Sequence, residues 1–169
     1  GEVNNNNSGQ DAIYLKGLAL NNTFINVRIL NTNKSFYDIE LTEATNFTYL
    51  VDMPHIGNYS FGAGRIVIFR NTQYGEIRFL QAINGAGNNL TNHVRIGNNS
   101  AIVESSNNTG LNKSANITLY GIGERGFIKP GMLRDGKPCP TGACNNFTAL
   151  NESIVRFNVT SWTNYSIGN

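Results

Sequence analysis

The chain has 169 residues, of which 13 are basic, 11 are acidic and only 14% are charged, for a formal net charge of +2. Its lysines and arginines are scattered singly, so no basic patch of the kind that binds nucleic acid or an anionic membrane surface is present in the sequence. No apolar run approaches the roughly 18 residues of a membrane-spanning helix, and no basic segment followed by an apolar stretch resembles a signal peptide. We therefore expect no nucleic-acid partner and no membrane insertion in this segment, which we interpret as mature or excised.

Strands dominate the predicted secondary structure. Apolar residues come in short runs rich in Ile, Val, Phe and Tyr, and clusters of Asn and Gly interrupt these runs before a helical period could reach three turns. Only residues 41–46 leave room for a single helical turn. The sequence predicts an all-β protein with strands at residues 12–20, 24–30, 36–41, 47–52, 65–69, 76–80, 94–96, 101–104, 115–120, 154–159 and 162–167.

The first region, residues 1–110, has Asn-Asn pairs and Gly between its short strands. Asn tolerates the left-handed backbone of a tight corner, so such pairs suit a chain that turns repeatedly. Residues 21–32, NNTFINVRILNT, resemble a rung of the right-handed parallel β-helix repeats of NosD-like and other archaeal surface proteins. The resemblance implies a short solenoid with an irregular period of roughly 20 to 26 residues, and a β-sandwich with long strands stays open as the alternative.

The run at residues 12–20 follows a polar segment and has a second interpretation. An exposed sheet edge can accept a strand from a neighbouring subunit, so this run is a candidate donated strand. An ordinary first rung of the solenoid is the other interpretation. The apolar residues that such a strand would donate are Ile13, Leu15, Leu18 and Leu20.

The second region, residues 111–169, has a different pattern. Residues 114–121 (SANITLYG), 133–139 (LRDGKPC) and 157–166 (FNVTSWTNYS) resemble a small immunoglobulin-like β-unit found in predicted archaeal cell-surface proteins. Asp135-Gly136 predicts a two-residue hairpin loop. Cys139 and Cys144 enclose a short turn-forming stretch, which predicts a disulfide in an extracellular protein. Two thiols are too few for a structural zinc site, so we expect neither a metal nor another cofactor.

Asparagine is the most informative residue type, with 28 of 169 positions. Fourteen of these begin the N-glycosylation pattern Asn-x-Ser/Thr, where random placement would give about 4. In a strand, the Asn and the Ser/Thr share one face and the middle residue points to the other, so we expect sugars on solvent faces of strands that bury their other face. Amide ladders without sugar are the alternative. The predicted acceptors are Asn6, Asn21, Asn33, Asn46, Asn58, Asn89, Asn98, Asn107, Asn112, Asn116, Asn146, Asn151, Asn158 and Asn164.

Catalytic patterns are hard to find, and we expect no catalytic residues and no enzyme. The sequence favours a heavily N-glycosylated extracellular structural protein of the archaeal surface, forming a pilus-like filament or sheath by strand pairing between copies of itself. Its partners would be other copies of the chain and covalent N-glycans.

Two alternatives use other residues. The first is a carbohydrate-binding or adhesion module, whose cell-surface polysaccharide would stack on Trp162 and Tyr165. The second is a β-helix polysaccharide lyase or hydrolase, which would need Asp38 and Glu40 beside a third ionisable group in a groove.

Overall fold

The computed structural model describes residues 1–4, 9–17, 21–30, 35–42 and 47–169, and it confirms the all-β expectation. Its helical segments are short: α1 (Leu90–His93), η1 (Thr109–Leu111) and η2 (Gly123–Arg125). None of the helices in the described ranges is long and apolar enough to cross a membrane. The strands are β1 (Glu2–Asn4), β2 (Ile13–Leu15), β3 (Asn22–Ile25), β4 (Arg28–Leu30), β5 (Ile39–Leu41), β6 (Thr48–Val51), β7 (Tyr59–Arg65), β8 (Val67–Asn71), β9 (Gly75–Phe79), β10 (Ile83–Gly87), β11 (Val94–Gly97), β12 (Ser100–Val103), β13 (Ala115–Tyr120), β14 (Gly131–Arg134), β15 (Lys137–Pro138), β16 (Cys144–Asn146), β17 (Ile154–Val159) and β18 (Asn164–Gly168).

The first eight strands pair in parallel at regular distances along the chain. β1 pairs with β4, β2 with β5 and β3 with β6, and in each pair the partners lie 26 residues apart. The distance along the chain is shorter in the next two pairs, because β5 pairs with β7 across 20 residues and β6 with β8 across 19. These offsets lie in or just below the range expected from the sequence. The parallel pairing ends at β8, which turns back on β9 in an antiparallel hairpin.

Asparagine makes several of the corners in this part of the chain. Asn21 and Asn26, on either side of β3, have φ angles of 53° and 48°, in the left-handed region that Asn tolerates better than most residues. Asp52 turns the chain after β6 with a φ of 48°. The left-handed corners expected from the Asn pattern are therefore present at both ends of β3.

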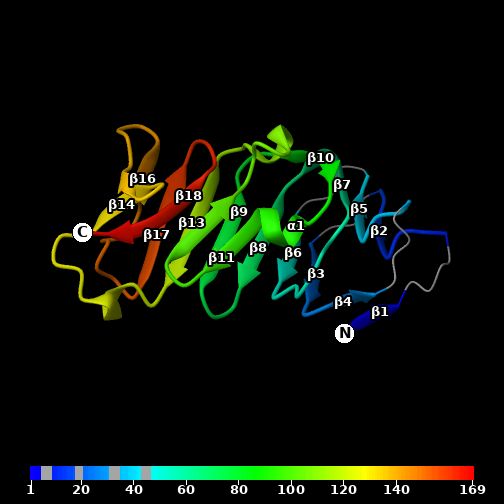
Figure 1. The fold of residues 1–169 in the computed structure, drawn as a ribbon, viewed down its shortest axis with the longest axis horizontal. Coiled ribbons are helices and arrows are strands. Elements are labelled where there is room, and N and C mark those ends of the chain that lie inside the picture. The colour runs from blue at the N-terminus through cyan, green and yellow to red at the C-terminus, as the bar shows by residue number, and fades with distance from the viewer. Residues whose placement is uncertain (5–8, 18–20, 31–34, 43–46) are drawn as a thin grey trace.

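One seven-stranded sheet connects the two predicted regions. Its strand order is β16-β17-β13-β9-β8-β6-β3, so β13, from residues 111–169, lies between β9 and β17. Figure 1 shows these strands side by side along the longest axis of the molecule. A five-stranded sheet of order β11-β12-β18-β14-β15 also joins strands from both regions. Strand pairing thus continues across residue 110 in both sheets.

The two sheets enclose a hydrophobic core. Aromatic rings connect them, since Trp162 lies 5.7 Å from Phe79 of β9 and 6.0 Å from Tyr165 of β18. The core continues under the parallel strands to Ile39 and Ile13, so one cluster of buried side chains runs through both regions. The inner faces of both sheets, and of the four-stranded sheet β10-β7-β5-β2, contribute side chains to it.

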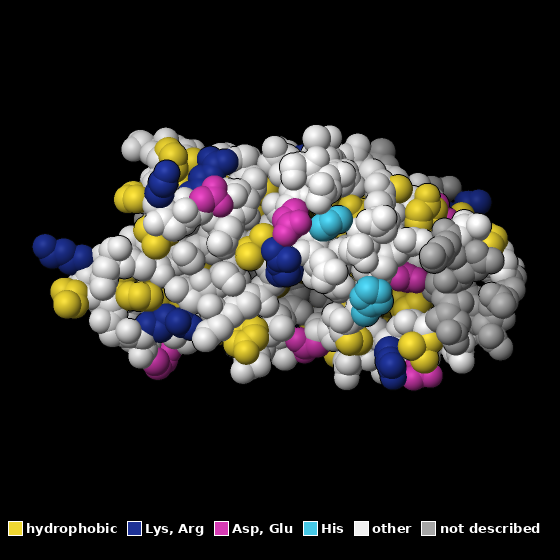
Figure 2. Space-filling model, viewed as in Figure 1, with side chains coloured by type: hydrophobic (Ala, Val, Ile, Leu, Met, Phe, Trp, Pro, Cys, Tyr) yellow, Lys and Arg dark blue, Asp and Glu magenta, His cyan; other side chains and the backbone are white. Residues whose placement is uncertain are grey.

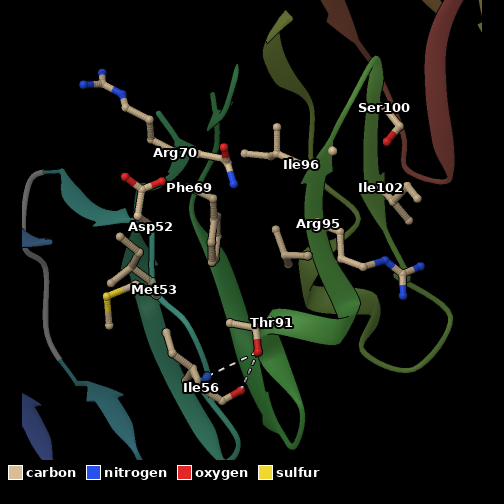
Figure 3. Close-up of a pocket in the computed structure, with 14 residues that line it drawn as sticks. Asp52, Met53, Ile56, Phe69, Arg70, Thr91, Arg95, Ile96, Ser100 and Ile102 are labelled. Atoms are coloured by element: carbon tan, nitrogen blue, oxygen red, sulfur yellow. Dashed lines mark hydrogen bonds between the residues drawn. The ribbon is translucent and has the colours of Figure 1, made fainter. Parts of the chain in front are cut away.

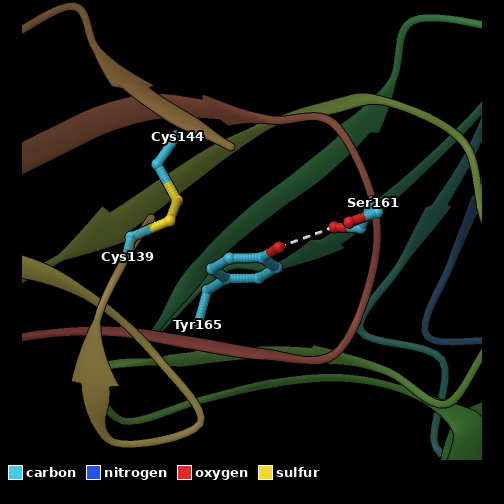
Figure 4. Close-up of a disulfide and its surroundings, with 4 residues drawn as sticks. All are labelled: Cys139, Cys144, Ser161 and Tyr165. Atoms are coloured by element: carbon cyan, nitrogen blue, oxygen red, sulfur yellow. Dashed lines mark hydrogen bonds between the residues drawn. A yellow bond between two sulfur atoms is a disulfide. The ribbon is translucent and has the colours of Figure 1, made fainter. Parts of the chain in front are cut away.

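The C-terminal hairpin and disulfide are as predicted. Arg134 pairs with Lys137 across a two-residue loop, and the loop residues Asp135 and Gly136 have φ angles of 51° and 72°. Positive φ at both positions is typical of the type I′ turn that Asp-Gly favours. A disulfide joins Cys139 to Cys144 near the buried ring of Tyr165 (Figure 4).

The candidate donated strand is paired within its own chain. Ile13 is buried in the core and Leu15 packs against it, while β2 pairs in parallel with β5. In this structure β2 is therefore paired within its own chain and is not donated to another. Leu18 and Leu20 lie outside the described residues.

Candidate functional site

The predicted glycan acceptors lie at the surface. Asn6, Asn33 and Asn46 fall outside the described residues, and none of the other eleven is buried. Three are half-buried on sheets or at strand ends, namely Asn58, Asn116 and Asn158. The exposed ones are Asn21, Asn89, Asn98, Asn107, Asn112, Asn146, Asn151 and Asn164.

The middle residues of these tripeptides explain why the acceptors face outward. Tyr59, Leu90, Ile117, Val159 and Tyr165 each expose 0% of their surface. Leu90 begins α1, but the other four lie in strands, where neighbouring residues point to opposite faces, so a buried middle residue forces the flanking Asn and hydroxyl residue toward solvent. The core therefore fixes the orientation of these acceptors, as the alternation in the sequence predicts. The exception is the exposed Phe147, and the other apolar middle residue, Phe47, is half-buried.

Some acceptor amides already make hydrogen bonds. Asn58 donates from Nδ2 to the carbonyl of Phe36 at 3.3 Å, and Asn146 donates from Nδ2 to the carbonyl of Thr148 at 3.1 Å. A glycosylated amide nitrogen keeps one N–H, so either bond is compatible with a linked sugar. These contacts orient the two side chains and leave one N–H of each amide nitrogen for attachment of a sugar.

The outer face of the seven-stranded sheet has an arginine and tyrosine cluster. Glu76 accepts hydrogen bonds from Arg70 at 2.5 Å and from Arg78 at 3.2 Å, and both guanidinium groups lie within 6 Å of the Tyr49 ring centre. The bond to Glu76 raises the pKa of Arg70 above its ordinary value, against the opposing effect of burial. With Glu76 only 8% exposed, its buried carboxylate is paired by both arginines, and the cluster stabilises an open sheet face.

The two outermost strands of this sheet lie toward different ends of the molecule. β3 adjoins the N-terminal parallel strands, whereas β16 lies beside the C-terminal hairpin (Figure 1). Large apolar side chains are exposed near both, since Ile25 of β3 is 60% exposed and Phe147, directly after β16, is 58% exposed. Sequence reasoning did not single out either residue, because exposure at an edge depends on which strands become neighbours.

A groove of about 400 Å³ opens between the parallel strands and the β11–β12 hairpin (Figure 3). Its wall is mainly apolar, with Met53, Ile56, Phe69 and Ile96 among its lining residues. The charged residues at its rim have partners elsewhere in the chain. Asp52 accepts hydrogen bonds from the N–H and hydroxyl of Thr72.

The charge at the other side of the groove is paired as well, because Arg95 bonds to Glu104 at 2.6 Å. Within the described part of the chain no group of three or more His, Cys, Asp or Glu side chains could hold a metal ion. The groove therefore offers apolar contact and no cluster of free ionisable groups.

Asp38 and Glu40, the residues of the lyase or hydrolase alternative, have different partners. Asp38 is 8% exposed and accepts a hydrogen bond of 2.5 Å from the backbone N–H of Gly57. Burial, and then the hydrogen bond and negative charge of Asp11, raise the pKa of Glu40, while a hydrogen bond from Ser60 lowers it. Neither acid lines one of the described cavities. Asp38 thus stabilises the turn before β7.

The predicted sugar platform at Trp162 and Tyr165 is corrected by the structure. Trp162 is 5% exposed and donates from Nε1 to the carbonyl of Lys113 at 2.7 Å, and Tyr165 is 0% exposed. A sugar can stack only on an accessible ring face, so these rings serve the core instead. Their place between the two sheets is the physical reason, since Trp162 packs on Phe79 of one sheet and on Tyr165 of the other.

Known proteins give no further guide to the site. No family model, no curated protein and no solved structure matches this chain.

Proposed function

We propose that the chain is a structural subunit of an extracellular, heavily N-glycosylated cell-surface filament or sheath, of the kind built by archaea, and that subunits join by strand pairing. The observation that carries the proposal is the seven-stranded sheet, which extends along the molecule with β3 and β16 as its outermost strands. A sheet with two different edges can continue from one copy into the next.

The directions of the edge strands suit head-to-tail growth. Following the parallel and antiparallel pairings from β3 to β16 shows that these two strands run in the same direction. The β16 strand of a second copy could therefore pair in parallel with β3 of the first copy. Within the chain, β6 already pairs in parallel with the other side of β3. Because this contact joins two different surfaces, it does not close on itself and produces an open polymer.

Backbone groups at the β3 edge are available for such pairing. The amide of Asn26 donates to the carbonyl of Val51 in β6 at 2.9 Å. Successive amides along a strand point to opposite sides, so the N–H of Ile25 points away from β6 toward the open edge. The exposed side chain of Ile25 would gain apolar contact when a neighbour covers this edge.

The glycan acceptors support the same function. Figure 2 shows one face of the molecule, on which most atoms are neutral and the charged side chains form only small groups. Sugars on the outward-facing asparagines would supply solubility and block unspecific strand pairing where charge does not. The disulfide is typical of an oxidising, extracellular setting.

Substitution of Ile25 by proline tests the assembly. Proline removes the N–H that points to the open edge and leaves the bonds between β3 and β6 intact, so the isolated subunit should fold. Loss of one backbone hydrogen bond, about 1.4 kcal/mol, weakens subunit association about tenfold, and the proline ring obstructs the neighbour further. We expect purified, glycosylated protein to form filaments in electron micrographs and Ile25→Pro to remain monomeric at the same concentration.

Ile25→Val is the matched control, because it keeps the N–H and most of the apolar surface. It should polymerise like the unsubstituted chain, and all three proteins should unfold at similar temperatures. Filament formation by Ile25→Pro would contradict pairing at β3. Monodisperse particles of the unsubstituted protein at high concentration would contradict the filament itself.

A further inference from the structure

Two predicted glycan acceptors lie directly opposite each other. Asn116 of β13 and Asn158 of β17 are partners in the antiparallel register, although 42 residues separate them in the chain. Ile117 and Val159, which follow them, are buried, so both asparagines project from the outer face of the sheet. The Cβ atoms of directly opposed residues lie about 4.5 to 5.5 Å apart.

The surroundings leave little free space beside the pair. Both side chains are half-buried, and the register continues to Asn145 on one side and to Arg78 on the other. A pyranose ring with its hydroxyl groups is wider than the spacing between opposed residues. Two sugars attached side by side on this face would therefore overlap.

The side-chain oxygens of the two asparagines indicate how one sugar would fit. Oδ1 of Asn116 and Oδ1 of Asn158 are both buried and lack a hydrogen-bond partner among the described residues. An unpaired buried carbonyl is costly, and a sugar hydroxyl or N–H is a donor of the kind it requires. A sugar attached to either asparagine would lie over the other, and its donors would reach that oxygen once the side chain turns toward them.

We propose that Asn116 and Asn158 form one composite acceptor, which carries a single N-glycan on each molecule, attached to either asparagine. The sugar on one residue covers the other and excludes a second attachment. This inference rests on the proposed glycosylation and adds to it a rule for which acceptors are occupied together.

Intact-protein mass spectrometry of the chain from a host that adds N-glycans tests the rule. Asn116→Gln and Asn158→Gln should each keep the same number of glycans as the unsubstituted protein, because the remaining asparagine takes over. The double variant should lose one glycan. Glycopeptide mapping should show that the occupancies of the two sites add up to no more than one per molecule.

Asn89 and Asn151 are a matched control pair, since both are exposed and they are not register partners. Each single Gln variant there should lose one glycan and their double variant two. The proposal is overturned if the Asn116 and Asn158 single variants each lose a glycan and the double loses two. It is also overturned if the double variant loses none. A bare mass of 18.5 kDa for every protein would instead contradict the proposed glycosylation as a whole.

Discussion

The hydroxyl of Tyr165 donates a hydrogen bond of 2.7 Å to the backbone carbonyl of Ser161, four residues earlier (Figure 4). Tyr165 is the second residue of β18, and its ring is fully buried against Trp162. The bond closes the turn between β17 and β18, much as the tyrosine corner does in Greek-key β-proteins. The bond therefore fixes the connection between β17 of the seven-stranded sheet and β18 of the five-stranded sheet.

Removal of this hydroxyl should destabilise the protein. In Tyr165→Phe the partly buried carbonyl of Ser161 loses its donor, and we expect the free energy of unfolding to fall by about 1 to 2 kcal/mol. Urea unfolding followed by the fluorescence of the single tryptophan, Trp162, would measure the loss. Tyr14→Phe, at a ring that is mostly exposed, is the control and should change stability by less than about 0.5 kcal/mol. Equal stability of both variants would show that the corner bond contributes nothing.

Gly75 should not tolerate a side chain. It has a φ of 149°, and a Cβ atom added there would lie 2.0 Å from the carbonyl oxygen of Thr118 in the neighbouring strand. We expect Gly75→Ala to lower stability by at least about 2 kcal/mol, because the backbone conformation and the pairing of β9 with β13 would both be strained. In Gly131→Ala the nearest atom is 3.8 Å away, so that variant should unfold at the temperature of the unsubstituted protein or slightly above it.

Glu40 should make stability depend on pH. Burial and the neighbouring Asp11 raise its pKa in the folded state above the ordinary value of 4.5, so folding favours the protonated carboxyl group. Its contribution to stability is complete below the unfolded pKa and is lost as the pH rises through the folded pKa. Glu40→Gln has no carboxyl group to ionise and should not lose this stability. The free energy of unfolding of the variant, compared with that of the unsubstituted protein, should therefore rise as the pH increases above about 4.5. Urea unfolding measured at a series of pH values from about 4.5 upward would detect the difference. If the stabilities of the two proteins changed in parallel with pH, Glu40 would not be the group responsible.

The disulfide should stabilise β16 locally. The bonded cysteines are only 5 residues apart, and closing so short a loop contributes about 2 kcal/mol in the chain-entropy model. We expect Cys139→Ser with Cys144→Ser to lower stability by that amount and to increase hydrogen exchange in β16. Exchange in β13, in the middle of the same sheet, should change far less. A uniform increase across the sheet would mean that the disulfide stabilises the whole fold.

Strands rich in glycine were the main features that the sequence did not predict. β7 contains Gly62 and Gly64, and β10 contains Gly85 and Gly87, so both segments look like turns in the sequence. A Cβ atom at Gly87 would lie 2.9 Å from the hydroxyl oxygen of Tyr59, in the neighbouring strand β7. Close approach of this kind requires glycine, and it arises only when distant segments have come together.

The sequence by itself determined which side chains face outward. In β13 and β17 the alternation of apolar and polar residues was sufficient, because successive side chains of a strand point to opposite faces and the apolar set must be buried. The Asp135-Gly136 hairpin was equally local, since two residues that tolerate positive φ fix the loop.

Only the tertiary structure decided which surfaces became neighbours. It buried Trp162 between two sheets, left Ile25 exposed at an edge, and brought Asn116 opposite Asn158. The register between strands far apart in the chain depends on the packing of the whole core, and no local pattern contains that information.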